Sequence, residues 1–234
     1  MAHGQIDATE GFGLRMGIEI DLLRNYPRTN RDLTARQEEK SEEVREIARQ
    51  FGKEFFDGDR RFGYGGFSYN PRFWEPVIPD LIHHFGSLEN KSVLDVGCAK
   101  GFMLYDLKRY SPSTEIRGVD VSEYAINHAI PEIKENLMVA DAKSLPFEDS
   151  SFDLVISINT IHNLDLEDCK LALGEITRVS RGNAFLTVDA YSNREEEERM
   201  MAWNLTAKTI LSVDDWKSLF EEVGYEGDYF WFIP

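Results

Sequence analysis

A carboxylate and two glycines follow one short apolar run, in the segment Ser92-Val-Leu-Asp-Val-Gly-Cys-Ala-Lys-Gly-Phe. The run predicts a strand that ends near Asp95, and Gly97 and Gly101 let the backbone turn sharply and approach a ligand closely. The helix that follows would point its first amides at polar groups of that ligand. In open α/β sheets ligands bind beyond the carboxyl ends of the strands, so this turn is the first candidate binding site.

Two further carboxylates end the next two expected strands, at Asp120 and Asp141. Asp120 is placed to accept hydrogen bonds from both hydroxyls of a ribose, and such charge-assisted bonds are worth about 1.5–3 kcal/mol. The carboxylate of Asp141 can accept from an adenine amino group, while the amide of Ala142 can donate to a ring nitrogen. Together with the glycine turn, these residues predict a nucleoside-binding site.

In order and spacing, these segments resemble class I S-adenosylmethionine (SAM) dependent methyltransferases, and more narrowly the small-molecule branch that includes quinone- and sterol-methylating enzymes. The resemblance covers about residues 80 to 190. It implies a Rossmann-like fold with SAM as the cofactor. Carried over by position, it also implies that the methionine part of SAM is lined by Asp95, Gly97, Cys98 and Gly101. Asp120 would hold the ribose and Val121 would pack on the adenine. The adenine would be recognised by Asp141 and Ala142, and Asn159 would supply backbone contacts.

Two features depart from the pattern of this family. Ala99 replaces the usual middle glycine of the first turn, a change that leaves room for a ligand. The family's sheet normally ends in a two-strand hairpin, whereas one terminal strand is evident here. A dinucleotide-binding oxidoreductase is the natural alternative, but its fingerprint wants glycines at relative positions one, three and six. Those positions hold Gly97, Ala99 and Phe102, so SAM is the better prediction.

Two candidate catalytic residues follow the fourth and fifth expected strands, where the acceptor would meet the methyl group. His162 can act as a general base, because the reference pKa of histidine lies near neutrality. The alternative is a histidine with a structural role. Tyr191 also opens on the expected pocket. It can donate a hydrogen bond to a substrate oxygen or merely cover the edge of the sheet.

A run of glycines and aromatic residues, over 60–74, precedes the helix that leads into the first strand. Glycines give a mobile backbone and aromatic rings give broad contact surfaces. In the family this region commonly caps the cofactor and the acceptor. We therefore expect a lid in which Tyr64, Tyr69 and Trp74 exclude water and Arg72 pairs with a carboxylate of SAM or of the acceptor. The alternative is a surface loop whose aromatic side chains complete the core.

Helices and strands alternate from residue 75 onward, which predicts βαβ units and a mostly parallel sheet with helices on both faces. We expect strands over 92–96, 115–119, 137–140, 152–158, 184–188 and 228–233, and helices over 76–85, 102–110, 123–130, 166–180, 195–211 and 213–223. Apolar residues at three-to-four spacing predict one amphipathic helix over 34–56. The predicted fold is thus a Rossmann-like α/β domain over 76–234, with an N-terminal helical cap and lid over 1–75.

Composition narrows the class of partner. The 234 residues carry a net charge of -16, so DNA, RNA and anionic membrane surfaces would be repelled at long range. The longest apolar runs fall far below the roughly 20 residues of a membrane span. Cys98 and Cys169 lie far apart, so no metal site and no disulfide framework is expected and a reducing cytoplasm fits.

The sequence therefore predicts a cytoplasmic SAM-dependent methyltransferase, monomeric or homodimeric, that acts on a small-molecule acceptor. This acceptor would be a metabolite, a natural product or a sugar intermediate. Two alternatives remain open. A SAM-utilising enzyme with other chemistry, such as cyclisation or transfer of another carbon group, would release methylthioadenosine in place of S-adenosylhomocysteine. A non-catalytic SAM-binding protein would bind the cofactor without turnover on any acceptor.

Overall fold

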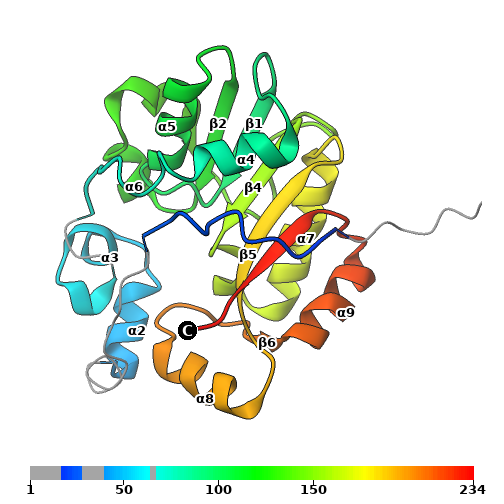
Figure 1. Ribbon diagram of the computed structural model, residues 1–234. Helices are drawn as coiled ribbons and strands as arrows, with labels where there is room; N and C mark the ends of the chain where they lie inside the picture. Colours follow the sequence, from blue (N-terminus) through cyan, green and yellow to red (C-terminus); the bar gives the residue numbers. More distant parts are fainter. Residues whose placement is uncertain (1–16, 28–39, 64–66) are drawn as a thin grey trace, which may run out of the picture.

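A seven-stranded parallel sheet forms the centre of the computed structural model, which describes residues 17–27, 40–63 and 67–234 (Figure 1). The strands are β1 (Ser92–Val96), β2 (Glu115–Asp120), β3 (Leu137–Val139), β4 (Leu154–Ile158), β5 (Ala184–Tyr191), β6 (Leu211–Ser212) and β7 (Asp228–Phe232). Their order is β3-β2-β1-β4-β5-β6, with β7 also paired to β5, and every ladder is parallel. The predicted Rossmann-like α/β class is confirmed.

Helices cover both faces of the sheet, because right-handed crossovers between parallel strands place them there. The helices of this part are α4 (Ile78–Phe85), α5 (Phe102–Tyr110), α6 (Glu123–Asn127), α7 (Leu166–Val179), α8 (Arg194–Trp203) and α9 (Val213–Val223), with short 3₁₀ turns η2 (Pro131–Asn136) and η3 (Ile161–Asn163). The predicted ranges 102–110 and 213–223 agree at both ends with α5 and α9.

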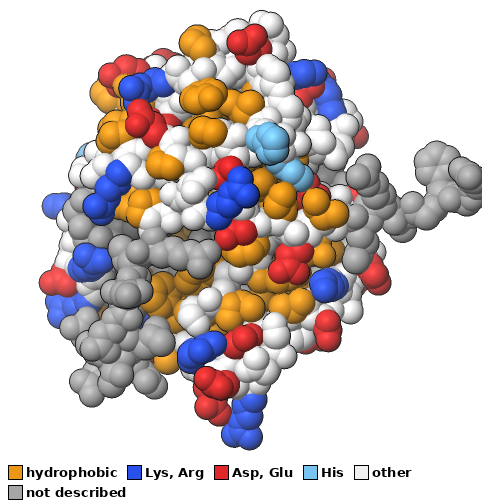
Figure 2. Space-filling model, viewed as in Figure 1, with side chains coloured by type: hydrophobic (Ala, Val, Ile, Leu, Met, Phe, Trp, Pro, Cys, Tyr) orange, Lys and Arg blue, Asp and Glu red, His pale blue; other side chains and the backbone are white. Residues whose placement is uncertain are grey.

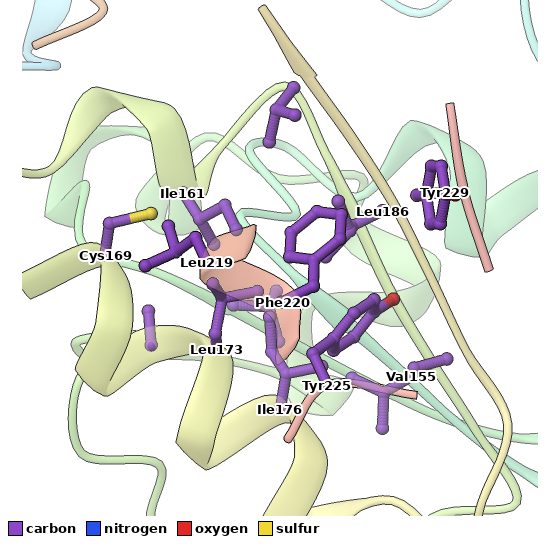
Figure 3. Close-up of a cluster of buried hydrophobic side chains, with 14 of the residues drawn as sticks. Val155, Ile161, Cys169, Leu173, Ile176, Leu186, Leu219, Phe220, Tyr225 and Tyr229 are labelled. Atoms are coloured by element: carbon purple, nitrogen blue, oxygen red, sulfur yellow. The ribbon is translucent and has the colours of Figure 1, made fainter. Parts of the chain in front are cut away.

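Two apolar clusters, one on each face, hold these layers together. One lies between the sheet and helices α7 and α9, where Leu173, Leu186 and Phe220 are all 1% exposed or less. Figure 3 shows side chains of this cluster converging from the two helices and from β5. The other cluster lies between the sheet and helices α4 and α5 and includes Leu81, Leu104 and Phe185. Nearly every residue of β1, β4 and β5 is buried, as expected for central strands.

Within the described residues 40–63, two short helices lie where the sequence predicts one over 34–56. Residues 34–39 of that range lie outside the described residues. The helices are α2 (Glu42–Ala48) and α3 (Lys53–Asp57), followed by η1 (Arg60–Phe62). Phe51 adopts a left-handed φ of 47°, and Gly52 caps α3, so the helix is interrupted between them. The carbonyl of Phe51 accepts a hydrogen bond from the hydroxyl of Ser122, so the interruption docks this region on the loop after β2.

Helix α8 ends eight residues earlier than the sequence predicts. The side chain of Asn204 exchanges hydrogen bonds with the backbone of Ala207 and so forms a turn after Trp203. The amides of Lys208 and Thr209 then donate to the carbonyl of His162. Because these backbone groups are committed to the turn and to η3, they cannot continue the helix.

The end of the sheet beside β5 has one terminal strand in the described residues. β7 pairs directly with β5, from Phe185 opposite Asp228 to Asp189 opposite Phe232. On its other side, Tyr229 exchanges backbone hydrogen bonds with residues 18 and 20. Figure 1 shows this N-terminal segment, in dark blue, running beside the red strand β7. The N-terminal segment therefore covers the edge that a family hairpin would occupy.

Candidate active site

The turn from β1 into α5 adopts the conformation that its glycines predict. Gly97 and Gly101 have φ angles of 89° and 79°, in the left-handed region that disfavours other residues. A Cβ on Gly97 would lie 2.1 Å from the hydroxyl oxygen of Thr160, which follows β4. The amides of Gly97 and Cys98 both donate to the carbonyl of Val119. Glycine is therefore required here because two neighbouring strand ends close tightly around the turn.

Ala99, which replaces the usual middle glycine, also has a left-handed φ, of 50°. A residue with a Cβ pays roughly 1–2 kcal/mol for this conformation, a cost that glycine avoids. Glycine also has more conformational freedom in the unfolded chain, which offsets part of that gain in stability. We expect Ala99→Gly to raise the free energy of unfolding by about 0.5 kcal/mol. Urea denaturation with an unchanged m-value would measure it, and a loss of stability would contradict it.

Asp95 is a buried carboxylate at the carboxyl end of β1. It is 5% exposed, and no described residue donates a hydrogen bond to its side chain. Burial, with a smaller contribution from the nearby charge of Asp120, raises its pKa to about 8. Because an unpaired buried charge is costly, the site favours either a proton or a cationic ligand next to this carboxylate.

Asp120 ends β2 and joins the loops that follow β1 and β2. Its two carboxylate oxygens accept the backbone amides of Ala99 and Ser122, each at 2.8 Å. Burial raises the pKa of Asp120, and these two amides partly oppose the shift. Each oxygen keeps a second lone pair for a ligand hydroxyl. Beside it, Val121 exposes 60% of its surface, which leaves an apolar side chain at the position expected to meet the adenine.

Asp141 follows β3, next to the end of β2, because the amide of Ala140 donates to the carbonyl of Asp120. The Asp141 carboxylate accepts the backbone amide of Lys143 and is 47% exposed. Ala142 is partly buried against the cluster below it. The ammonium of Lys143 lies 3.6 Å from Asp141. The structure thus brings the ends of β1, β2 and β3 together as the sequence predicts.

Asn159 is exposed at the carboxyl end of β4 and has a left-handed φ of 51°. Its amide donates to the backbone carbonyl and the hydroxyl of Thr187 on β5, and its side-chain oxygen accepts from the same hydroxyl. These bonds fix the orientation of the residue between the two strands. Cys98, in contrast, turns inward: a Cβ on Gly118 would lie 2.7 Å from its sulfur. The Cys98 thiol therefore packs in the interior.

His162 is buried, with 4% of its surface exposed, in η3 after β4. Its Nδ1 accepts the backbone amide of Asp189 at 2.9 Å, so the neutral ring carries its proton on Nε2. Burial lowers the pKa of His162, and the charge of Asp189 opposes this shift. The lone pair of Nδ1 is therefore occupied by the backbone of β5, and Nε2–H remains as a hydrogen-bond donor.

Tyr191 is partly exposed at the end of β5, where its backbone pairs with Ser212 of β6. Burial raises the pKa of its hydroxyl, and the charges of Glu197 and Asp215 add to the shift. Tyr191 therefore stays protonated over the neutral range and can act only as a hydrogen-bond donor or acceptor. Its surroundings belong to the first turns of α8 and α9.

Two of the residues expected in the lid, Tyr69 and Trp74, contact aromatic and polar side chains of the described residues. Tyr69 donates to Asp106 at 2.5 Å and its ring contacts Phe102 and Tyr105, so it packs along α5. The ring of Trp74 meets that of Tyr26, with centroids 4.9 Å apart. Both rings therefore pack against neighbouring aromatic side chains, as a loop whose aromatic residues complete the core would do.

Two members of the expected lid remain. Arg72 is exposed, and its guanidinium lies 4.7 Å from the centre of the Phe73 ring. In this position Arg72 pairs with no carboxylate of the described residues. Tyr64 lies outside the described residues. Asp57 of α3 and Phe67, which lies within the expected lid, both contact Lys100 in the turn between β1 and α5.

A buried lysine that the sequence analysis missed joins α3 to the cofactor loop. The ammonium of Lys100 donates to both carboxylate oxygens of Asp57 at 2.8 Å and to the carbonyl of Phe67 at 2.7 Å. Its side chain is 6% exposed. Asp57 also accepts the hydroxyl of Tyr124, and these donors lower its pKa against the effect of burial. The sequence signal that could have identified Lys100 is the position of a lysine in the middle of the turn between β1 and α5.

The described part of the chain spans residues 17–27, 40–63 and 67–234. Within it, no group of three or more His, Cys, Asp or Glu residues could hold a metal ion. None of its helices is both long enough and apolar enough to span a membrane.

A parallel sheet with carboxylates near the ends of its first three strands and a glycine turn after β1 is the architecture of the Rossmann-like methyltransferase fold. The chain belongs to the methyltransferase domain family, whose model matches residues 87–224, more than half of the sequence. The predicted class of enzyme and its cofactor, SAM, are confirmed by this match.

Among the relatives is an uncharacterised protein of Haemophilus influenzae, 34% identical over 62% of this chain and 62% of its own. A sterol 24-C-methyltransferase of Gibberella zeae is 27% identical over 70% of this chain and 48% of its own. A tRNA (carboxymethyluridine(34)-5-O)-methyltransferase of Arabidopsis thaliana is 31% identical over 59% of this chain and 33% of its own. The chain thus spans a third to three fifths of the length of these relatives.

The fold likeness extends to solved structures. One is a chain from the complex between the Haloferax volcanii Trm112 methyltransferase activator and a methyltransferase, with a TM-score of 0.51. Its sequence is 21% identical, and the match covers 61% of this chain and 66% of that one. At this identity the likeness concerns the fold alone.

The described residues fit SAM, which carries two positive charges, an ammonium and a sulfonium, next to a ribose and an adenine. Asp95 offers an unpaired buried carboxylate to a cation. Asp120 offers two free lone pairs, and Val121 offers an exposed apolar surface beside them. When bound, SAM supplies a methyl group made electrophilic by the positive sulfur. The chemistry of the residues at the strand ends is therefore complementary to that of the cofactor.

Proposed function

We propose that this methyltransferase transfers the methyl group of SAM to a small-molecule acceptor, with the cofactor lying across the carboxyl ends of β1, β2 and β3. The observation that carries the proposal is the set of carboxylates at these ends. Asp95, Asp120 and Asp141 end or follow consecutive strands of the sheet order. Asp95 is buried without a hydrogen-bond donor among the described residues, which favours a cation in its vicinity.

Each residue at the strand ends has a proposed role that its surroundings support. Asp95 and the backbone of Gly97, Cys98 and Gly101 line the methionine part of the cofactor. Asp120 accepts the two ribose hydroxyls. The adenine packs on Val121, with Asp141 accepting its amino group and the amide of Ala142 donating to its ring. Asn159 contributes its backbone beside the methyl group.

The acceptor side is held by the ends of β4 and β5. The occupied Nδ1 of His162 supports a role as a donor through Nε2–H, which orients the acceptor without removing its proton. The phenol of Tyr191 supports a similar donor role. Alignment of the acceptor with the methyl group and exclusion of water supply most of the rate enhancement in such a displacement.

The charge of the chain supports a small acceptor over RNA, although one relative is named as a tRNA methyltransferase. The net charge of -16 repels a polyanion. Figure 2 shows that on one face of the molecule acidic and basic side chains are interspersed, without a continuous basic patch. An RNA-binding surface needs such a patch to track the phosphates.

The cysteines support a reducing compartment, and we propose the cytoplasm. Cys98 and Cys169 are both buried and both free in the structure. Burial raises the pKa of each thiol, to about 12 for Cys169, so neither is a reactive thiolate. Free thiols in the core are typical of proteins kept in a reducing environment.

The proposed function is tested by supplying the purified protein with SAM labelled in its methyl group and a fractionated cell extract. We expect S-adenosylhomocysteine to form together with a labelled small molecule, which mass spectrometry would identify. Label confined to the tRNA fraction would replace the small-molecule proposal. Release of methylthioadenosine would indicate transfer of another carbon group, and binding without turnover would indicate a non-catalytic protein.

Replacing Asp120 by alanine should weaken SAM binding by one to two decades, because the ribose would lose two charge-assisted hydrogen bonds. Each decade corresponds to about 1.4 kcal/mol. Isothermal titration calorimetry with SAM and with S-adenosylhomocysteine would measure the loss, which should be similar for both because they share the ribose. An unchanged dissociation constant would contradict the assigned role.

A further inference from the structure

The carboxylate of Asp189 lies on the same face of the sheet as Asp95. Side chains alternate between the two faces of a strand. Phe185 of β5 packs in the cluster under α4 and α5, so Asp189, four residues later, lies on that face. Val93 of β1 packs in the same cluster, which places Asp95, two residues later, on that face too. Both carboxylates thus lie toward the carboxyl ends of strands and on one side of the sheet.

Asp189 extends beyond the end of the neighbouring strand. The ladder between β4 and β5 ends at Ile158 opposite Thr187, two residues before Asp189. The amide of Asn159 then bonds Thr187 and turns the chain away into η3. Asp189 therefore extends past the last paired residue of β4 and lies beside His162 of η3.

Both backbone polar groups of Asp189 form hydrogen bonds to side chains, whereas its carboxylate accepts none from the described residues. The amide donates to Nδ1 of His162 and the carbonyl accepts the indole N–H of Trp216, each at 2.9 Å. The residue is 7% exposed, and the described part of the chain provides no hydrogen-bond donor to its carboxylate. Nδ1 of His162 lies 3.8 Å from Oδ1, but both atoms are acceptors in this arrangement. A buried carboxylate without a donor is costly unless a ligand supplies one.

Two charged or titratable groups face this carboxylate, His162 from η3 and Lys40 from the segment before α2. Burial raises the pKa of Asp189, and these two groups oppose the shift. The ammonium of Lys40 donates to the carbonyls of Ala202, Trp203 and Asn204 at the end of α8. Lys40 thus joins the N-terminal region to α8 while it lies near Asp189.

An open pocket of about 710 Å³ lies between α2 and α8. Lys40 belongs both to the wall of the pocket and to the surroundings of Asp189. The neighbour of Asp189 across the sheet is Phe232, whose ring lies 5.5 Å from that of Trp203. The neighbour of Asp189 in the ladder is therefore an aromatic residue packed against α8, and Lys40 links the surroundings of Asp189 with the pocket.

We propose that Asp189 meets the proton-bearing group of the acceptor and removes its proton, so that the acceptor is an O–H or N–H compound and not a carboxylate. This inference rests on the proposed function and names the class of its acceptor. A carboxylate acceptor would bring a second negative charge against Asp189 in a buried place, and Lys40 is already engaged by the end of α8.

The step balances without any other reactant. A lone pair of the acceptor oxygen or nitrogen forms the bond to the methyl carbon. The carbon–sulfur bond breaks and its electron pair stays on sulfur, which leaves neutral S-adenosylhomocysteine. The proton of the acceptor passes to a carboxylate oxygen of Asp189 and from there to solvent.

The test compares wild-type protein with Asp189→Asn, which keeps the shape and both backbone hydrogen bonds but lacks the basic carboxylate. The probe is labelled SAM with a panel of phenols, aliphatic alcohols, amines and carboxylic acids. We expect product from the O–H or N–H compounds, and a decrease in kcat of about 10²–10⁴-fold in the variant. The wild-type kcat should rise with pH through the pKa of the carboxyl group, and this limb should disappear in Asp189→Asn.

Two controls separate the possible failures. Asp214→Asn changes an exposed acid of α9 and should leave kcat unchanged. SAM binding by calorimetry should be the same in wild type and Asp189→Asn, which shows that a loss of kcat does not come from misfolding. If wild type and Asp189→Asn transfer methyl groups equally, or if the product is a methyl ester of a carboxylic acid, the Asp189 inference is wrong and the proposed function stands. If wild type binds SAM but methylates nothing, both fall together.

Discussion

Replacing Asp95 by asparagine should stabilise the cofactor-free protein at high pH and weaken SAM binding. The pKa of Asp95 is about 8, against 3.8 in its ordinary state. The folded state therefore holds a proton that the unfolded state has lost, and stability falls as the pH rises between these two values. At 1.36 kcal/mol per pKa unit, this difference lowers the free energy of unfolding by roughly 6 kcal/mol at most once the pH exceeds both values. We expect about 2–4 kcal/mol greater stability for Asp95→Asn at pH 9, after relaxation around the site.

The same carboxylate should make SAM binding depend on pH. A cationic ligand favours the ionised form, so binding should release a proton below pH 8 and the affinity should increase toward that pH. Calorimetry in two buffers with different ionisation enthalpies would measure the proton, which should be absent in Asp95→Asn. We expect the variant to bind SAM about 10- to 100-fold more weakly, at 1.4 kcal/mol per decade.

Asp153 gives a control of opposite sign at the other end of the same sheet. Its carboxylate accepts the amide and the hydroxyl of Ser92 and pairs with Arg181, so its pKa is lowered. Asp153→Asn should therefore reduce stability at neutral pH and leave SAM binding unchanged. If Asp95→Asn behaves like Asp153→Asn, with lower stability and no effect on proton release, Asp95 is a structural residue and its cofactor role is wrong.

Removing the ammonium of Lys100 should both destabilise the fold and loosen the cofactor loop. Lys100→Met leaves Asp57 without its main partner and the carbonyl of Phe67 without a donor. Breaking a buried ion pair costs about 3–5 kcal/mol. Because α3 is held to the turn through this pair, we expect SAM affinity to fall by about tenfold as well, at 1.4 kcal/mol per decade. Urea unfolding and calorimetry would measure the two effects.

A double-mutant cycle assigns the effect to the pair. Lys100→Met combined with Asp57→Asn should cost much less than the sum of the two single changes, because neither variant then buries an unpaired charge. Lys208→Met is the matched surface control, since its ammonium pairs with an Asp165 side chain that is 71% exposed. It should change neither stability nor SAM binding appreciably. Additive losses in the cycle would show that Lys100 and Asp57 act independently.

Local sequence patterns determined most of the sheet and of the nucleoside site. The strand over 92–96 and the helices over 102–110 and 213–223 are predicted to the residue, because their apolar periodicity and their glycine or serine boundaries agree. The ends of β1, β2 and β3 come together because parallel strands joined by short crossovers all finish at one edge. Asp95, Asp120 and Asp141 are therefore neighbours as a consequence of chain order.

Contacts between distant segments decided the rest, and no periodic pattern encodes them. The helix expected over 195–211 stops at Trp203 because Asn204 forms a turn, and the amides of Lys208 and Thr209 after this turn bind η3, which lies far earlier in the chain. The predicted lid over 60–74 contributes aromatic side chains to the packing along α5, since Tyr69 finds its partner in Asp106.

The amino-acid sequence by itself thus determined the class of fold, predicted the cofactor of the family, and placed carboxylates at the ends of β1, β2 and β3. Only the tertiary structure decided that Lys100 holds α3 through Asp57, that His162 has its Nδ1 occupied, and that Asp189 is buried without a donor. The physical reason is that the pKa and the freedom of a side chain depend on burial and on partners from other strands. Residue type and spacing specify the strand on which a group lies, but its electrostatic environment exists only after the strands have packed.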